Sequence, residues 1–249
     1  RPLQDLSEKF NILQSAMASS ERVFALLDEP ETVRDPVAPR RLARPVRGEV
    51  AFEDVWFRYP RASAGGERPA EDGWVLKGVT FAARPGRTVA IVGHTGAGKT
   101  TIINLLLRFY DVDRGRITVD GVDIRELRQA ELRALVGLVQ QDIFLFTGDI
   151  RTNIRLDAPL PDSAVEAAAR RVGATGFIER LPARFDHRLD ERGQNLSVGE
   201  RQLLSFARAL AVDPAILVLD EATSSVDAQA EERIQAAIAE LMRGRTSLV

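Results

Sequence analysis

The segment Gly93-His94-Thr95-Gly96-Ala97-Gly98-Lys99-Thr100 limits the fold of this chain more than any other. The apolar run Arg87–Val92 enters it and predicts a strand, and the stretch from Gly98 to about Phe109 predicts the helix that leaves it. Glycines at 93, 96 and 98 let the backbone curl so that its N–H groups point inward. Strand, glycine-rich turn and helix in this order predict an α/β fold with an anion-binding loop.

The polar side chains of this loop make a purely structural glycine turn a poor explanation. Lys99 adds a full positive charge where the β- and γ-phosphates of a nucleotide would lie, and the Thr100 hydroxyl is a ligand for Mg²⁺. We therefore predict a nucleotide-binding loop. Its expected binding residues are Gly93, His94, Thr95, Gly96, Ala97, Gly98, Lys99, Thr100 and Thr101.

Two acidic residues follow the most apolar run of the chain. Asp220 and Glu221 come directly after Ala215–Leu219, which predicts a buried strand, and α/β sheets bind ligands at the carboxyl ends of their strands. Asp220 is expected to hold Mg²⁺ through water, and Glu221 to polarise the attacking water as a general base. The alternative is a pair of solvated surface acids.

Composition narrows the class of protein. Apolar residues make up 45% of 249 residues and the formal net charge is −2, so no overall basic field indicates nucleic-acid binding. There is no cysteine, which excludes disulfides and thiolate metal sites. No apolar run reaches the ~18–20 residues that a membrane span needs. The chain begins without methionine and ends inside a strand pattern, so we expect a piece of a longer polypeptide.

The N-terminal part has a separate organisation. Apolar residues recur at spacings of three and four from Leu6 to Leu27, which predicts a long amphipathic helix. Such a helix either docks on its own domain or is the cytosolic end of a membrane helix or a partner-packing helix. Residues 30–47 contain four prolines among arginines and predict an extended tether.

The remaining patterns predict a mainly parallel α/β core with additions. Partial alternation in Gly48–Tyr59 and Val75–Phe81 predicts early antiparallel strands, with a mobile loop over 60–73 between them. Short strands and a helix are expected over 117–139, helices over about 142–211, a further helix from about Ala228 to Met242 and a strand from Thr246.

The second motif is Leu196-Ser197-Val198-Gly199-Glu200-Arg201-Gln202. Read locally, Ser197 and Glu200 form a capping box that starts a helix through Leu210. Together with the phosphate loop, this motif resembles the signature of ATP-binding-cassette (ABC) proteins. The chain is similar over its whole length to exporters in which a membrane domain and an ATPase are fused. The implied fold is an ABC-type P-loop NTPase with a parallel core, an antiparallel β subdomain and a helical subdomain.

The resemblance implies roles for further residues. Tyr59 stands where the family has the aromatic residue that stacks on adenine; its alternative is local packing at a strand end. Gln141, beside Gln140, matches the glutamine that contacts Mg²⁺ or the attacking water. Ser197 and Gly199 match positions that bind the γ-phosphate held by an opposing subunit. Asp190–Gly193 resembles a segment that touches membrane-domain helices, and Ser224–Asp227 resembles a loop that crosses a dimer interface.

Two features depart from the family pattern. The usual signature has glycine and glutamine where this chain has Val198 and Glu200, and an acid near a γ-phosphate predicts a weaker site, as in a heterodimer. The family's switch histidine would follow Val249. Neither His94 nor His187 stands in that position, so a chain that ends at Val249 is expected to bind ATP but hydrolyse it poorly.

The resemblance implies a domain plan and a function. Residues 1–29 are expected to extend the last transmembrane helix, 30–47 to be a linker, and 48–249 to be the nucleotide-binding domain. The expected ligands are ATP and Mg²⁺. The expected partners are a second such domain and the coupling helices of the polypeptide's own membrane domain. The expected location is the cytoplasmic face of the inner membrane. Transported substrate and nucleic acid are not expected to bind. The alternatives are a non-transport ABC ATPase and a regulatory ATP-binding subunit.

Overall fold

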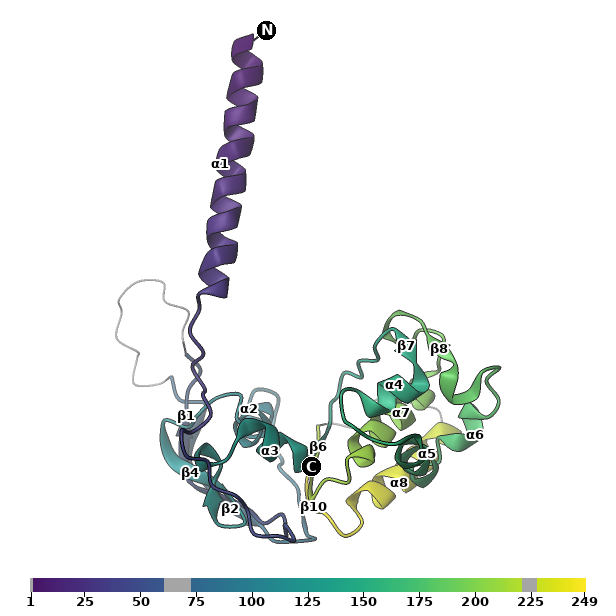
Figure 1. The fold of residues 1–249 in the computed structure, drawn as a ribbon. Coiled ribbons are helices and arrows are strands. Elements are labelled where there is room, and N and C mark those ends of the chain that lie inside the picture. Colours follow the sequence, from purple (N-terminus) through teal and green to yellow (C-terminus); the bar gives the residue numbers. More distant parts are fainter. Residues whose placement is uncertain (1, 61–72, 221–227) are drawn as a thin grey trace. The chain divides into compact units, whose positions relative to one another are not determined.

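The computed structural model describes residues 2–60, 73–220 and 228–249 (Figure 1). They fall into two compact units, Arg1–Arg34 and Asp35–Val249. The loop expected over 60–73 lies almost wholly outside the described residues. Glu221 and the segment Ser224–Asp227 lie outside them as well.

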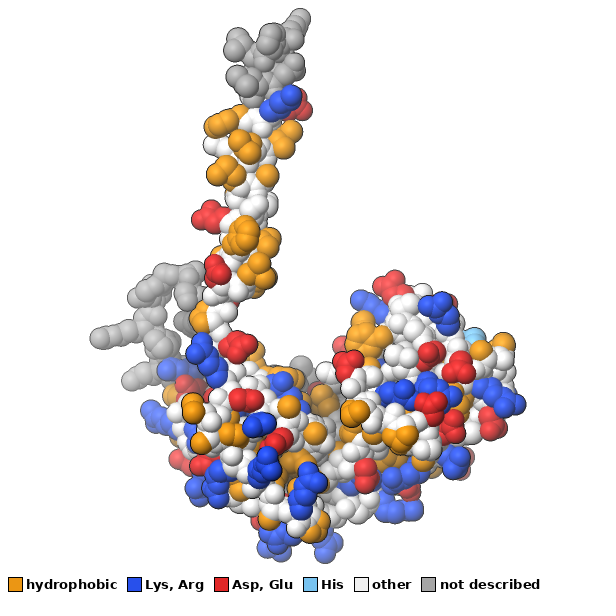
Figure 2. All heavy atoms as spheres, in the orientation of Figure 1, with side chains coloured by type: hydrophobic (Ala, Val, Ile, Leu, Met, Phe, Trp, Pro, Cys, Tyr) orange, Lys and Arg blue, Asp and Glu red, His pale blue; other side chains and the backbone are white. Residues whose placement is uncertain are grey.

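The first unit is helix α1 (Pro2–Leu27) followed by a short extended segment. Its large apolar side chains are exposed along the helix, and Figure 2 shows them as successive groups on its surface. They are Phe10, Ile12, Leu13, Met17, Val23, Phe24, Leu26 and Leu27. No helix among the described residues is both long enough and apolar enough to cross a membrane.

An antiparallel sheet of order β2-β1-β4-β5 opens the second unit. Phe52 in its central strand pairs with Phe81 on one side and Ile117 on the other, and the two phenylalanine rings stack with centroids 4.6 Å apart. This inward face forms one hydrophobic core. The strands are β1 (Val50–Phe57), β2 (Leu76–Ala83), β4 (Arg114–Val119) and β5 (Val122–Asp123).

A parallel sheet of order β3-β10-β9-β6 confirms the predicted α/β core. All four residues of its central strand β9 are buried, as expected for a strand covered on both faces. The strands are β3 (Thr88–Val89), β6 (Val136–Val139), β9 (Ile216–Leu219) and β10 (Thr246–Leu248).

The helices also follow the predicted order. Helix α2 (Lys99–Leu106) lies between β3 and β4 in the chain, and the 3-10 turn η1 (Ile124–Glu126) and α3 (Gln129–Ala134) lie between β5 and β6. The helical region has its own core. The helices of this region are α4 (Ile150–Arg155), α5 (Asp162–Arg171), α6 (Thr175–Ile178) and α7 (Val198–Ala211), with the 3-10 turns η2 (Arg184–Asp186) and η3 (Glu191–Gly193). The region also contains the two-stranded sheet of β7 (Gly148–Asp149) and β8 (Arg188–Leu189). Helix α8 (Ala228–Met242) follows β9 in the chain.

Two predicted elements are shorter than expected. The strand before the phosphate loop is regular only over β3, although the N–H of Ile91 still donates to the carbonyl of Val249 at 2.6 Å. Helix α2 ends at Leu106 rather than near Phe109. It ends there because Arg108 takes a positive φ of 52°, which no α-helix continues through.

Part of the expected linker lies along the second unit. We call residues 35–49 the strap. Both carboxylate oxygens of Asp120 accept strap N–H groups, from Arg47 at 2.7 Å and from Glu49 at 2.8 Å. The backbone N–H of Arg40 donates to the carbonyl of Glu126 at 2.8 Å. A composition typical of a free tether therefore folds here as an attached segment.

Candidate nucleotide-binding site

One cleft of about 470 Å³ gathers most of the residues that the sequence singled out. It contains residues from five separate stretches of the chain: the segment after β1, the residue before β2, the phosphate loop with the start of α2, the segment after β6 and the residue after β9. Its lining is Tyr59, Val75, His94, Thr95, Gly96, Gly98, Lys99, Thr100, Thr101, Gln141 and Asp220.

The glycines of the loop serve two needs. Gly96 and Gly98 have φ of 84° and 94°, which side-chain-bearing residues avoid. A Cβ at Gly98 would lie 2.8 Å from Cδ2 of the buried Leu76, and a Cβ at Gly93 would lie 2.9 Å from the Cβ of Ala97. The curl thus depends on backbone freedom at two glycines and on close approach at Gly93 and Gly98.

Helix α2 begins without help from a side chain. Its N-cap is Gly98, and no side-chain hydrogen bond caps it. The first N–H groups of an α-helix have no partner within the helix and carry its positive dipole end. Lys99 stands at the same place, where its Nζ donates to the carbonyl of Gly93 at 2.7 Å. Backbone donors and an ammonium group converge on one side of the cleft.

Tyr59 is fixed at the rim of the cleft. Its hydroxyl lies 3.0 Å from Oγ1 of Thr101, and Nδ2 of Asn104 donates to it at 3.4 Å. Its ring packs edge-on against Phe57 and Tyr110, with centroids 5.0 and 5.1 Å away. Tyr59 therefore makes the local packing that the sequence left as the alternative to adenine stacking, and it also lines the cleft.

Gln141 and Asp220 reach the cleft from neighbouring parallel strands. Asp220 follows β9 and Gln141 lies two residues after β6, and the N–H of Asp220 donates to the carbonyl of Val139 at 2.9 Å. Because parallel strands end at the same sheet edge, both side chains line the cleft together with Thr100. A hydroxyl, an amide and a carboxylate are the oxygen donors that Mg²⁺ accepts. No group of three or more His, Asp or Glu that could hold a metal occurs within the described ranges.

Ser197 and Gly199 lie elsewhere, in a second pocket of about 460 Å³. The predicted capping box is present: Oε2 of Glu200 accepts from the N–H of Ser197 at 2.9 Å, and Oγ of Ser197 accepts from the N–H of Glu200 at 3.2 Å. Arg180 and Arg233 line the same pocket. One chain thus separates its two motifs into two sites.

Sequence reasoning missed one residue that lines the first cleft and one that supports it from behind Tyr59. Val75 lines it from just before β2, and Asn104 supports the Tyr59 hydroxyl from α2. The position of Asn104 five residues after Lys99 was the available signal, because it puts the side chain in the second turn of the helix. The segment Asp190–Gly193, for which the family resemblance implies contacts with membrane-domain helices, contains η3 with Arg192 at a φ of 56°.

The comparisons with known proteins agree with this geometry. The family model of the ABC transporter matches residues 76–224. The chain is 46% identical, over all of its length and 40% of that protein, to the ABC transporter ATP-binding protein YfiC of Bacillus subtilis strain 168. It is 44% identical to a fatty acid ABC transporter ATP-binding/permease protein of Mycobacterium bovis, again over 100% of this chain and 37% of that protein.

A solved structure extends the similarity to the fold. A bacterial Atm1-family ABC exporter with ATP bound aligns with a TM-score of 0.78 at 37% identity, covering 100% of this chain and 42% of that one. The chain spans about 40% of the length of the curated relatives it matches.

Proposed function

This chain belongs to the ABC transporter family, and we propose from that premise that it is the ATP-hydrolysing domain through which a membrane exporter uses MgATP. The observation that carries the proposal is the single cleft that gathers the phosphate loop, Tyr59, Gln141 and Asp220. The hydrogen-bond donors of the phosphate loop match the phosphates of a nucleotide–metal complex, the aromatic ring of Tyr59 matches the base, and the side-chain oxygens match the metal ion.

Phosphate binding falls to the start of α2. Its uncapped N–H groups and the curled loop from Gly93 to Gly98 donate to the phosphate oxygens, and Lys99 neutralises charge at the β- and γ-phosphates. Thr100, Asp220 and Gln141 hold Mg²⁺, directly or through water. Bound by these residues, Mg²⁺ would offset the negative charge that develops during phosphoryl transfer.

The nucleoside binds at the rim. Tyr59 stacks on adenine, a contact that contributes roughly 1–3 kcal/mol in comparable stacks of bases on aromatic side chains. Its ring is held by Phe57, Tyr110 and Thr101, so little side-chain freedom is lost when the base binds. Glu221 polarises the attacking water as a general base.

A second domain completes the site. The signature residues Ser197 and Gly199 lie outside the cleft of their own chain, so we infer that they bind the γ-phosphate held by another copy or by a related domain. Nucleotide between two faces favours the closed pair, and hydrolysis removes that preference. This is the step that drives transport.

The proposed domain plan follows the sequence. Residues 1–29 extend the last transmembrane helix of the same polypeptide, and 30–47 form a linker whose part from Asp35 onward lies along the second unit. Residues 48–249 form the nucleotide-binding domain at the cytoplasmic face of the inner membrane. The row of exposed apolar side chains on α1 supports a helix that packs against other helices. The transported substrate binds in the membrane domain, with coupling through helices that reach Asp190–Gly193.

The test is Glu221→Gln in the full-length polypeptide, with MgATP binding and turnover measured separately. Loss of a general base lowers turnover by roughly 10²- to 10⁴-fold, while nucleotide stays bound. Glu232→Gln is the matched control, because this acid is exposed on α8 and outside the cleft. Unchanged turnover in Glu221→Gln rules out the assigned base, and absent turnover in the wild type favours a regulatory module.

A further inference from the structure

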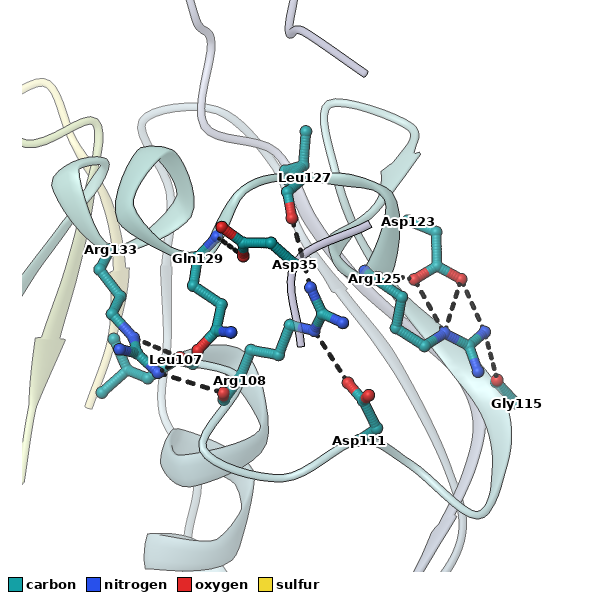
Figure 3. A network of polar contacts seen from close by, with 10 residues as sticks. All are labelled: Asp35, Leu107, Arg108, Asp111, Gly115, Asp123, Arg125, Leu127, Gln129 and Arg133. Atoms are coloured by element: carbon teal, nitrogen blue, oxygen red, sulfur yellow. Dashed lines mark hydrogen bonds and ion pairs between the residues drawn. The ribbon is translucent and has the colours of Figure 1, made fainter. Parts of the chain in front are cut away.

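The far end of the phosphate-loop helix is held by a side chain from another helix. Helix α2 ends at Leu106, and the carbonyls of its last turn accept N–H groups from the residues that follow. The next carbonyls, those of Leu107 and Arg108, lie just past the helix end, where the chain bends away. Arg133, in the last turn of α3, donates from Nε to the carbonyl of Leu107 at 3.1 Å and from Nη2 to that of Arg108 at 3.3 Å (Figure 3). A cation at this end also complements the helix dipole.

Arg133 is itself held in place. Its Nη2 donates to Oε1 of Gln129 at 2.9 Å, one turn earlier on α3, and its guanidinium lies 5.0 Å from the ring centroid of Phe109. Three kinds of contact therefore fix one side chain. Its orientation depends on where α3 begins.

The strap sets the start of α3. Oδ1 of Asp35 accepts the backbone N–H of Gln129 at 2.9 Å, which places a carboxylate at the amino end of the helix. Asp35 is also the first residue of the second unit. The other end of the strap is also attached to the second unit, because Asp120 accepts two of its N–H groups. A continuous set of contacts thus runs from Asp35 through α3 and Arg133 to α2.

We propose that Arg133 is a positioning residue for the phosphate-loop helix, and that Asp35 couples the attachment of the strap to nucleotide binding. The proposal rests on the nucleotide site proposed above. Helix α2 is a rod of about 12 Å, so a shift at Leu107 moves Lys99 at the other end. Phosphate contacts tolerate little displacement before they weaken.

The first experiment compares Arg133→Gln with Arg125→Gln in the full-length polypeptide. Arg125 lies in the same network, where its Nη2 donates to Asp123 at 2.7 Å and to the carbonyl of Gly115 at 3.3 Å. These partners belong to β5 and β4 rather than to α2. Both variants lose a comparable set of hydrogen bonds, so both are expected to melt at lower temperature.

Only Arg133→Gln is expected to weaken nucleotide binding. Its dissociation constant for Mg²⁺–trinitrophenyl-ATP should rise roughly three- to tenfold, and its KM for ATP should rise with little change in kcat. Arg133→Lys should recover part of the affinity, since it keeps the cation. Equal dissociation constants for Arg133→Gln and Arg125→Gln overturn the proposal.

The second experiment tests the strap. Asp35→Ala should raise the same dissociation constant roughly two- to threefold, whereas Asp35→Asn keeps an acceptor and should bind nearly as the wild type does. In an Arg133→Gln background, Asp35→Ala should add nothing. Arg40→Gln is the control, because Arg40 pairs with Glu126 at 2.9 Å and not with α3. Independent, multiplying effects of the two substitutions overturn the coupling.

The outcomes separate this inference from the proposed function. If Lys99→Ala abolishes nucleotide binding but neither Arg133→Gln nor Asp35→Ala changes it, only the inference fails. If the wild type itself does not bind nucleotide, the proposed function fails first. Asp35→Ala removes a single exposed acceptor, so it remains informative if Arg133→Gln does not fold.

Discussion

Helices α2 and α7 both begin at a pocket, yet they satisfy their first turns in different ways. Helix α2 follows Gly98, whose φ is 94°, and no side chain caps it. Helix α7 follows Ser197, and both halves of a capping box are made with Glu200. The N–H groups of the first turn receive no side-chain cap in α2, whereas in α7 a capping box accepts them.

Because of this difference, the start of α2 serves mainly ligand binding and the start of α7 mainly the stability of the fold. A glycine cap supplies no acceptor, so the donors of α2 stay available to an anion and that turn depends on a ligand. The serine cap of α7 stabilises the helix whether or not a phosphate arrives. We therefore expect substitutions at α2 to change nucleotide affinity more than stability, and substitutions at α7 to do the reverse.

The largest expected effect is at Lys99. Lys99→Ala removes a charged donor from the α2 site, which should weaken MgATP binding by about 1.5–3 kcal/mol, or roughly ten- to 150-fold. Isothermal titration of the 249-residue chain measures it. Lys77→Ala is the control, since Lys77 is exposed on β2 and outside the cleft. Equal affinities for the two variants contradict the assignment of the site.

Gly98→Ala should come next. The added Cβ meets Leu76 at 2.8 Å and the positive φ is lost or strained, at about 1–2 kcal/mol, so affinity should fall roughly five- to thirtyfold. Gly86→Ala has a similar φ of 69° with nothing within 4 Å of the new Cβ. If both variants bind MgATP alike, the loop does not require its observed curl.

Ser197→Ala tests the other side of the comparison. Losing the side-chain cap of α7 should cost about 1 kcal/mol, which lowers the melting temperature by roughly 2–4 °C for a domain of this size. MgATP affinity of the isolated chain should not change. A weaker affinity with unchanged melting would mean that α7 serves binding rather than stability, the reverse of the contrast with α2.

Glu200→Gln should have the smallest effect on stability, about 0.5 kcal/mol or less, since glutamine still accepts from Ser197. It removes the acid from a pocket that Arg180 and Arg233 also line. ATP-dependent association of two domains should strengthen a few-fold at low salt and less at high salt. Weaker association at low salt would show that the carboxylate assists the partner's nucleotide.

Much of the site was predictable because its parts are local motifs on regular elements. The phosphate loop, Asp220 and Gln141 each follow an expected strand, and the ends of parallel strands meet at one edge. The capping box at Ser197 was equally readable, because its two members are three residues apart.

The contacts between distant segments were not predictable. Prolines and arginines in residues 30–47 fit a free tether as well as a strap, and the difference depends on Asp120 and Asp35 accepting backbone N–H groups more than 70 residues away in the sequence. The end of α2 was missed for a similar reason. Nothing in the sequence marks Arg108 for a positive φ, and the donor that suits this bend, Arg133, belongs to another helix.

Because the strands of the parallel sheet carry residues of the cleft, the cleft forms only when these strands pair in the correct register. A slip of β9 by two residues against β6 would carry Asp220 about 7 Å along the strand, well away from Thr100 and Gln141. Misaligned conformers would then keep their hydrophobic interior but lose the ligand. Nucleotide added during refolding should accordingly select molecules with properly aligned strands, late in assembly rather than early.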